Sequence, residues 1–396
     1  MISPAEADTI IRNSAPALET ESRTLVGLSG AILREPIVAT RDQQPFDRVT
    51  MDGIAFASTS AKREFRIAGT QAAGTRRMVL ASSDACFEVM TGAVVPDGCD
   101  CVVPVERISI QEDVARLAED VVITPGMNIH TRGLDCRATT PLLDIGQRLG
   151  PPEVAIIASA GLARAQVSRS PRIIVISTGD ELIEPGEPVT DWQIYRSNAY
   201  AVLAALQRHG YLHLAHDHLP DEPDVLRTRL RSHLDTHDVL ILSGGVSMGK
   251  FDYVPQILGE LGIRMAFHNV AQRPGKPMWF GVGPQGRTVY ALPGNPVSTL
   301  VCLARYVYPG LSAAMGEIPA APRLVALGEP FDVKPVLAVF VPVKLATNEF
   351  GNLTALPRPT RGSGDFTSLL GTDGFVELPP GPVTMARGAA VPLYEW

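Results

Sequence analysis

Hydrophobic and polar positions follow two alternating patterns between Pro171 and Tyr308. Short, fully apolar runs are typical of strands that are buried on both faces of a sheet. Such runs occupy 172–177, 239–243 and 288–292, with a further possible strand at 212–218. Amphipathic stretches with helical spacing separate the strands at 198–209, 224–234, 254–261 and 296–308. Because strand and helix alternate throughout, the sequence predicts parallel βαβ units and a doubly wound α/β domain.

Helix signals also occur before this region. Ser3 and Glu6 have the spacing of a capping box around Pro4, which suits the first helical position. A short N-terminal helix is therefore expected. The run 153–160 has a helical pattern and is closed by Gly161.

The remaining segments indicate β structure. From about 35 to 143, brief apolar segments are broken by glycine and proline. After Pro309 short strands return, among them 336–345 and 374–378, which favour a small β-barrel or sandwich. We therefore expect a multidomain α/β plus β protein. Its expected parts are 1–34 together with 139–168 as an N-terminal helical and linker domain, 35–138 as a β-rich domain inserted in it, 169–316 as the α/β domain, and 317–396 as a C-terminal β-barrel-like domain.

Composition narrows the class of protein. The 396 residues carry a formal net charge of -7, so no global positive field is available to attract nucleic acid. No basic segment followed by an apolar run opens the chain, and no eighteen apolar residues occur together, so neither secretion nor a membrane span is expected. The five cysteines are scattered without C-x-x-C spacing, which indicates reduced thiols and a cytoplasmic protein.

Three predicted parallel strands end in small, polar, glycine-bearing loops, at 177–181, 243–247 and 293–298. Open α/β sheets bind ligands beyond the carboxyl ends of their strands, so the three loops should share one rim. Glycine allows backbone NH groups to approach phosphate oxygens closely. One such loop alone is explained by turn formation, but three that retain hydroxyl groups favour a phosphorylated ligand. The candidate binding residues are Thr178, Gly179, Ser243, Gly244, Gly245, Ser247, Pro293, Gly294, Asn295 and Ser298.

Charged residues of both signs accompany these loops. They are Asp180, Glu181, Asp221, Asp252, Lys250, Arg273 and Lys276. Carboxylates repel phosphate unless a hard cation lies between them, and Mg²⁺ prefers one or two carboxylates plus substrate phosphates, so a magnesium-bridged phosphate is predicted. Lys276 lies on a proline-bounded turn and suits an oxyanion. Helix capping explains Asp221 and Asp252 nearly as well.

Further motifs extend over nearly the whole chain. They are Thr50-Met51-Asp52-Gly53, Thr91-Gly92-Ala93 with Pro96, Gly98, Asp100 and Glu106, Gly126-Met127-Asn128, and Arg132-Gly133-Leu134-Asp135. Together with the three loops, and in this order, these motifs resemble the MoeA/gephyrin E-domain family of molybdopterin molybdenumtransferases. The resemblance implies a molybdopterin-binding type of α/β domain and a dimerising N-terminal part.

The resemblance also implies a function. A member of this family inserts molybdate into adenylylated molybdopterin with Mg²⁺ assistance and releases AMP. It implies an elongated homodimer, in which each cleft combines the α/β domain of one subunit with the β-rich domain of the other, and contacts with the molybdopterin adenylyltransferase and recipient molybdoenzymes. The implied catalytic residues are Asp52, Thr91, Asp221, Asp252 and Lys276; the implied metal ligands are Asp180, Glu181, Asp221 and Asp252; Ser298, Asn295 and Gly245 line the pterin phosphate site.

Some alternatives stay open at this point. A related nucleotide-handling enzyme, such as the adenylyltransferase that makes the preceding intermediate, has the same type of α/β domain. A scaffold that has kept the fold and binds a partner peptide is another possibility. For Asp52 and Thr91, an Asx turn and a turn hydroxyl are the structural explanation. The polar loop 361–365 suits a ligand loop and a surface turn equally well.

Overall fold

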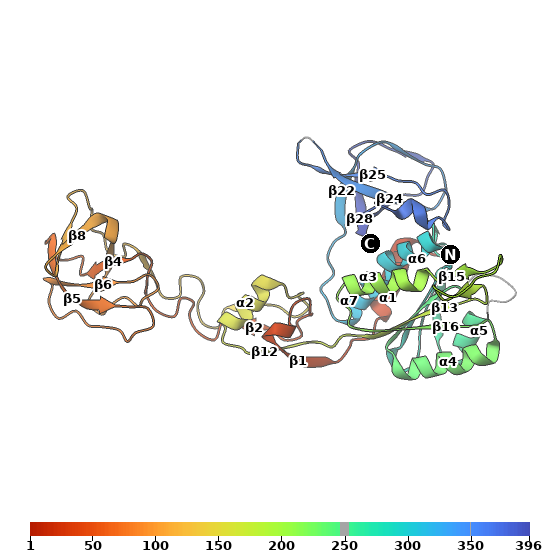
Figure 1. Ribbon diagram of the computed structural model, residues 1–396, viewed down its shortest axis with the longest axis horizontal. Coiled ribbons are helices and arrows are strands. Elements are labelled where there is room, and N and C mark those ends of the chain that lie inside the picture. The colour runs from red at the N-terminus through yellow and green to blue at the C-terminus, as the bar shows by residue number, and fades with distance from the viewer. Residues whose placement is uncertain (246–252, 349) are drawn as a thin grey trace.

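The chain forms an elongated molecule with separate lobes (Figure 1). The computed structural model describes residues 1–245, 253–348 and 350–396, so the predictions for Ser247, Lys250 and Asp252 lie outside the described residues. A β-rich lobe lies at one end of the molecule, a small lobe lies in the middle, and the α/β domain lies at the other end beside the C-terminal β domain (Figure 1).

A six-stranded sheet forms the centre of the α/β domain, in the order β16-β13-β17-β21-β20-β18. Its strands are β13 (Arg172–Thr178), β16 (His213–Leu219), β17 (Val239–Ser243), β18 (Arg264–His268), β20 (Trp279–Val282) and β21 (Thr288–Leu292). The first four strands in spatial order are parallel, as predicted. Strands β20 and β18 were not among the predicted strands, and they pair antiparallel. Only residues 283–287 separate β20 from β21, and a crossover to a parallel strand needs a much longer connection.

Helices cover both faces of this sheet. Helices α4 (Pro223–Thr236) and α5 (Val254–Glu260) lie on one face, and α1 (Pro4–Ser14), α3 (Asn198–Arg208), α6 (Pro296–Cys302) and α7 (Tyr308–Ala314) lie on the other (Figure 1). A π-helical turn, Leu303–Val307, makes α6 and α7 continuous. The capping box of Ser3 and Glu6 is present at the start of α1.

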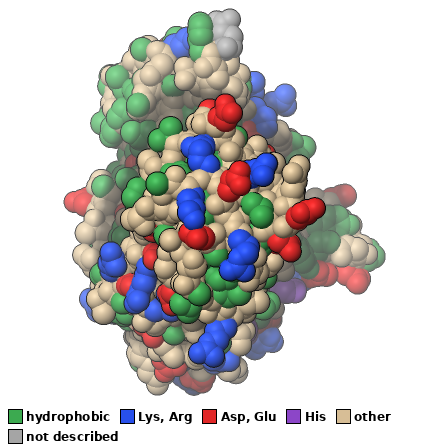
Figure 2. Space-filling model, turned by 90° about the vertical axis from the view of Figure 1, so that its left-hand side faces the viewer, with side chains coloured by type: hydrophobic (Ala, Val, Ile, Leu, Met, Phe, Trp, Pro, Cys, Tyr) green, Lys and Arg blue, Asp and Glu red, His purple; other side chains and the backbone are tan. Residues whose placement is uncertain are grey.

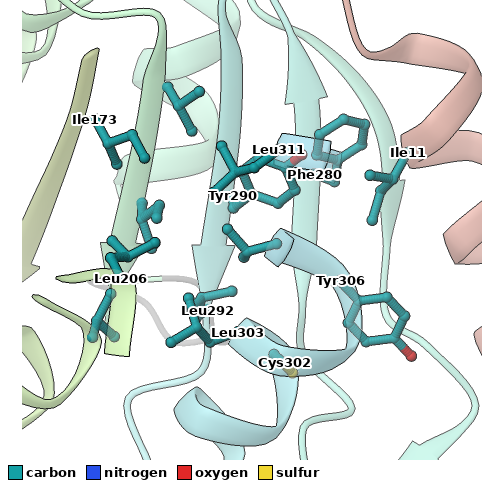
Figure 3. Packing of buried hydrophobic residues seen from close by; sticks show 14 of the residues in the cluster. Ile11, Ile173, Leu206, Phe280, Tyr290, Leu292, Cys302, Leu303, Tyr306 and Leu311 are labelled. Carbon is teal, nitrogen blue, oxygen red and sulfur yellow. The ribbon is translucent and has the colours of Figure 1, made fainter. Parts of the chain in front are cut away.

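The apolar face of α1 joins the core of the α/β domain. Ile11 packs with Leu311 of α7 and with Tyr290 and Phe280 of the sheet (Figure 3). All four side chains are buried. The first helix therefore lies with the α/β domain, although residues 1–34 as a whole were expected to form part of the linker domain.

The chain passes twice through the small middle lobe. Strand β1 (Thr20–Thr24) pairs antiparallel with β12 (Arg164–Ser168), and β2 (Ile37–Val38) pairs with β11 (Pro141–Leu143). Helix α2 (Pro151–Ser159) covers these strands. The core of the middle lobe includes Leu28, Leu33, Leu149 and Ile157.

Each of the two β domains has its own sheet. The β-rich lobe holds β4 (Gly53–Phe56), β5 (Glu64–Gln71), β6 (Ala85–Val89), β7 (Cys101–Pro104), β8 (Ile108–Gln111) and β9 (Val114–Leu117), with the short pair β3 (Arg48–Val49) and β10 (Ile129–His130) beside them. The C-terminal domain holds β22 (Arg323–Leu327), β24 (Ala338–Thr347), β25 (Leu353–Pro357), β26 (Gly374–Leu378) and β28 (Ala390–Glu395). Because β24 also pairs with β26, these five strands close into a barrel, as predicted.

Among the described residues, no helix is long and apolar enough to cross a membrane.

Candidate functional site

The three glycine-bearing loops meet at the carboxyl ends of β13, β17 and β21. The backbone N of Gly244 donates to the carbonyl of Leu292 over 3.2 Å. Gly244 has a φ of +100°, and a Cβ added there would lie 2.9 Å from the carbonyl oxygen of Thr178. The first and second loops are therefore in backbone contact, and only glycine fits between them. The predicted common rim is present in the structure.

Asn198, the first residue of α3, ties two of these loops together. Its side-chain amide donates to the hydroxyl of Ser243 over 2.9 Å and to the carbonyl of Gly294 over 2.7 Å. Sequence reasoning did not select Asn198, because an asparagine at the start of a helix is usually explained by capping.

A cavity of about 270 Å³, here named the rim cavity, opens between these loops. It is lined by Thr178, Glu181, Leu182, Ile194, Arg196, Asn198, Ser243, Gly244, Gly294 and Asn295, among others. Three buried polar atoms that line it have no hydrogen-bond partner: Thr178 Oγ1, Arg196 Nε and Asn198 Oδ1. Buried polar groups are normally paired, so these atoms point to a ligand that completes the site.

Of the predicted acidic residues that the structure describes, Glu181 lines this cavity and Asp180 directly precedes Glu181 in the chain. The backbone N of Asp221 donates to Asp180 Oδ1 over 3.1 Å, which brings the ends of β13 and β16 together. Glu181 folds over Gly179, where an added Cβ would lie 2.6 Å from Glu181 Oε2. Helix α4 has Glu222 at its N-cap position, so helix capping does not explain Asp221. Within the described ranges no three metal-ligating side chains form a group.

A second cavity, of about 600 Å³, lies between the α/β domain and the C-terminal barrel and is here named the interdomain cavity. The ionisable side chains among its described lining residues are Arg273, Lys276, Lys334, Arg361 and Asp332. Four cations therefore face one carboxylate. Since the whole chain is acidic, this cavity is a local concentration of positive charge.

Hydrogen bonds from a buried side chain hold the turn that carries Arg273 and Lys276. Buried Gln272 donates to the carbonyl oxygens of Pro274 and Gly275 over 3.1 and 3.3 Å, and it accepts a hydrogen bond from Tyr306. Strand β19 (Gln272–Arg273) pairs with β24 of the barrel. Both cations are thus positioned at the contact between the two domains.

The polar loop 361–365 closes over the third glycine-bearing loop. Asn295 donates from its side chain to Ser363 Oγ over 2.9 Å, and the backbone N of Val297 donates to the carbonyl of Ser363 over 3.0 Å. Asn295 lines both cavities, whereas Ser298 lines the interdomain cavity. This contact favours the ligand-loop interpretation of 361–365 over a free surface turn. Arg361 and Lys334 join the candidate residues because both line the interdomain cavity.

Asp52 and Thr91 lie apart from the other candidates, in the β-rich lobe. Asp52 Oδ1 accepts hydrogen bonds from Thr91 N over 2.6 Å and from Thr91 Oγ1 over 2.7 Å. These two bonds, the backbone one first, hold the pKa of the exposed Asp52 carboxyl below its ordinary value. Strands β4 and β13 lie at opposite ends of the molecule (Figure 1), so one chain does not bring this pair to the rim.

The outer face of the β-rich lobe shows basic and acidic side chains interspersed, without a field of one sign (Figure 2). This mixture is that of an ordinary solvated surface. This face therefore offers no concentration of positive charge like that of the interdomain cavity.

Comparisons with known proteins cover the whole chain. Three family models match in succession: the MoeA N-terminal region (domains I and II) over residues 2–161, a probable molybdopterin binding domain over 174–313, and the MoeA C-terminal region (domain IV) over 325–396. A molybdopterin molybdenumtransferase of Synechocystis sp. is 39% identical over 400 residues and covers 100% of both chains. One from Synechococcus elongatus is 33% identical and covers 95% of this chain and 92% of its own length.

A solved structure has the same overall fold. The molybdopterin biosynthesis MoeA protein from Pyrococcus horikosii matches 100% of this chain and 99% of its own, with a TM-score of 0.80 and 27% sequence identity. The arrangement of lobes in Figure 1 is thus also present in a relative.

Proposed function

Because this chain belongs to the MoeA family of molybdopterin molybdenumtransferases, we propose that it inserts molybdate into adenylylated molybdopterin and releases AMP. The observation that carries the proposal is the adjoining pair of cavities, which differ in charge and share Asn295. A substrate that contains both uncharged rings and phosphates matches such a pair.

The interdomain cavity is the proposed site for molybdate, a tetrahedral dianion. Arg273, Lys276, Lys334 and Arg361 supply positive charge and hydrogen-bond donors at its wall. Lysine and arginine complement oxyanions in different ways, one as a point charge and the other as a planar fork. Molybdate bound there lies next to Asn295, where the substrate phosphates would enter from the rim cavity.

Cleavage of a phosphoanhydride depends mainly on positioning and on neutralising the negative charge that develops. In this proposal Lys276 and Arg273 neutralise charge on the leaving phosphate and on molybdate, while Asn295 and Ser298 position the phosphate between the two cavities. None of these roles needs a covalent nucleophile.

Mg²⁺ fits the acidic side of the rim. The backbone N of Asp221 donates to the Asp180 carboxylate over 3.1 Å, so these two acidic residues adjoin at the rim. This donor set matches the preference of Mg²⁺ for one or two carboxylates and substrate oxygens. The ion would supply further charge neutralisation at the anhydride, and Asp180, Glu181 and Asp221 are the described residues that would hold it.

The second half of each cleft is proposed to come from another copy of the chain. Asp52 and Thr91 are exposed residues of the β-rich lobe, and this lobe lies at the opposite end of the molecule from its own α/β domain (Figure 1). In a homodimer with two-fold symmetry, the β-rich lobe of each chain lies against the rim of the other chain, so the dimer has two equivalent clefts. We further propose a cytoplasmic location, supported by the five unpaired cysteines, and transient contacts with the molybdopterin adenylyltransferase and with recipient molybdoenzymes.

Insertion measured with purified adenylylated molybdopterin, molybdate and Mg²⁺ tests this proposal. Lys276→Ala removes a charge-assisted contact of ~1.5–3 kcal/mol, so the KM for molybdate should rise roughly 10- to 100-fold. The control, Lys62→Ala, removes an exposed lysine paired with Asp84 in the β-rich lobe and should leave the KM unchanged. An unchanged KM in Lys276→Ala contradicts the molybdate site.

The same preparation separates the alternatives. Incubation with molybdopterin and ATP in the absence of molybdate would accumulate adenylylated pterin if the chain were an adenylyltransferase. A scaffold would catalyse neither reaction. AMP release that depends on molybdate supports the proposed insertion.

A further inference from the structure

Arg196 is the only cation among the described residues that line the rim cavity. Its side chain is 12% exposed and forms an ion pair with Glu184 through Nη2. Its Nε is buried and has no hydrogen-bond partner. A buried N–H group that lacks an acceptor is costly, so Arg196 carries a donor that a ligand can satisfy.

The position of Arg196 is set by two short strands. Strands β14 (Leu182–Ile183) and β15 (Ile194–Tyr195) pair in parallel, and the backbone N of Arg196 donates to the carbonyl of Ile183 over 2.9 Å. Glu184 and Arg196 therefore leave the paired strands at the same end. Tyr200 of α3 donates its hydroxyl to the other carboxylate oxygen of Glu184. The guanidinium is thus paired with Glu184 at Nη2 and has no partner at Nε.

The charge of the rim cavity differs from that of the interdomain cavity. The Arg196 cation is neutralised by Glu184, and Glu181 is the one carboxylate among the described lining residues. A phosphate or molybdate would find no unpaired cation there. An uncharged ligand is favoured, because its transfer from water costs little free energy and neither carboxylate repels it.

The unpartnered atoms indicate which hydrogen-bonding groups that ligand has. Arg196 Nε is a donor, Asn198 Oδ1 is an acceptor, and the Thr178 hydroxyl can be either. Leu182 and Ile194 contribute apolar walls to the same cavity. Planar nitrogen heterocycles combine apolar faces with an edge of alternating donors and acceptors, and they match this lining.

We propose that the rim cavity binds a planar, uncharged nitrogen heterocycle of the substrate, and that Arg196, anchored by Glu184, determines specificity by donating from Nε to an acceptor on its edge. The inference rests on the proposed function, because the adenylylated pterin supplies the heterocycle. Its pterin and its adenine both have the required edge, and they are distinguished by the probe that binds.

Calorimetric titration of the full chain tests the proposal with 6-hydroxymethylpterin, adenosine and molybdate as separate probes. The wild-type chain should bind one of the two heterocycles, and Arg196→Met should weaken that binding roughly tenfold or more. Arg196→Lys should not restore it, because an ammonium group cannot pair with Glu184 and also donate from the position of Nε. The control, Arg208→Met, changes an exposed arginine at the end of α3 and should leave the affinity within about twofold. Molybdate affinity should be equal in all variants.

Two outcomes overturn the inference: neither heterocycle binds to the wild-type chain, or Arg196→Met binds within about twofold of wild type. Thr178→Val serves as a second variant if Arg196→Met unfolds, and it too must lose affinity for the same heterocycle. Failure of the proposed function has a different signature, since the wild-type chain would then release no AMP from the adenylylated pterin while its titration with the heterocycle remained intact.

Discussion

Thr91 donates two hydrogen bonds to the same oxygen of Asp52, from its backbone N over 2.6 Å and from Oγ1 over 2.7 Å. Asp52 immediately precedes β4, Thr91 follows shortly after β6, and the two strands are antiparallel neighbours. Two bonds to one oxygen fix the orientation of the carboxylate and leave its second oxygen available. The carboxylate is therefore exposed and has a fixed orientation. The proposed action on a ligand held by another subunit requires both properties.

Thr91→Val should raise the pKa of Asp52 toward its ordinary value, because the hydroxyl bond that favours the carboxylate is lost. Asp52 stays ionised at pH 7 in both proteins, so a fall in insertion activity at that pH would report a change in orientation. Carbon NMR of the Asp52 carboxyl during an acid titration measures the pKa. A pKa that does not move in Thr91→Val would show that the hydroxyl bond is unimportant in solution.

Gly244→Ala should damage the rim more than it damages the fold. Its φ of +100° costs an L-residue ~1–2 kcal/mol, and the added Cβ lies 2.9 Å from the Thr178 carbonyl oxygen. Gly161 also has a positive φ, of +83°, but nothing lies within 4 Å of an added Cβ. Gly161→Ala is therefore the matched control, with a similar conformational cost and intact activity. Equal activities of the two variants, measured beside thermal unfolding, would argue against a function for the rim.

Asp238→Asn should lower stability in a pH-dependent manner. The Asp238 side chain is 5% exposed and accepts hydrogen bonds from Arg169, Arg172 and Arg287. Burial opposes its ionisation, but the bonds from Arg169 and Arg172 outweigh burial and hold its pKa far below the ordinary value. A carboxyl with a lowered pKa contributes stability above its unfolded pKa, and that contribution is lost as the pH falls toward the folded value.

Chemical denaturation measures this effect. The free energy of unfolding of Asp238→Asn should be lower than that of wild type by about 2 kcal/mol at pH 6, and the difference should narrow below about pH 4. Asp224→Asn is the control, because Asp224 is fully exposed and paired only at the surface with Arg227. A difference that is the same at pH 6 and pH 3.5 would contradict the assigned role of Asp238.

Much of the α/β domain could be predicted because its signals are local. The strands Val239–Ser243 and Thr288–Leu292 begin and end where their apolar runs do. Strand β18 was missed because its sequence, Arg264–His268, mixes polar and apolar residues at the sheet edge. Strand β20 was missed because it has only four residues between a proline turn and a glycine.

The site was less predictable because its contacts join distant parts of the chain. Ser363 meets Asn295 only after the barrel has docked on the α/β domain, so loop 361–365 could not be assigned from sequence. Arg196 was missed for a similar reason, since its burial and its pairing with Glu184 depend on the short strands β14 and β15. The separation of Asp52 from the rim of its own chain was expected only from the family resemblance.

Mixing two inactive variants tests most directly whether each cleft is shared between subunits. Asp52→Ala and Lys276→Ala should each strongly reduce insertion when assayed alone at a molybdate concentration below the wild-type KM. After unfolding and refolding together, half of randomly paired dimers are mixed and each holds one intact cleft, so about a quarter of wild-type activity should return. Recovery at that level supports a site built from two chains. Refolded mixtures that form dimers yet stay as inactive as the separate variants would contradict it.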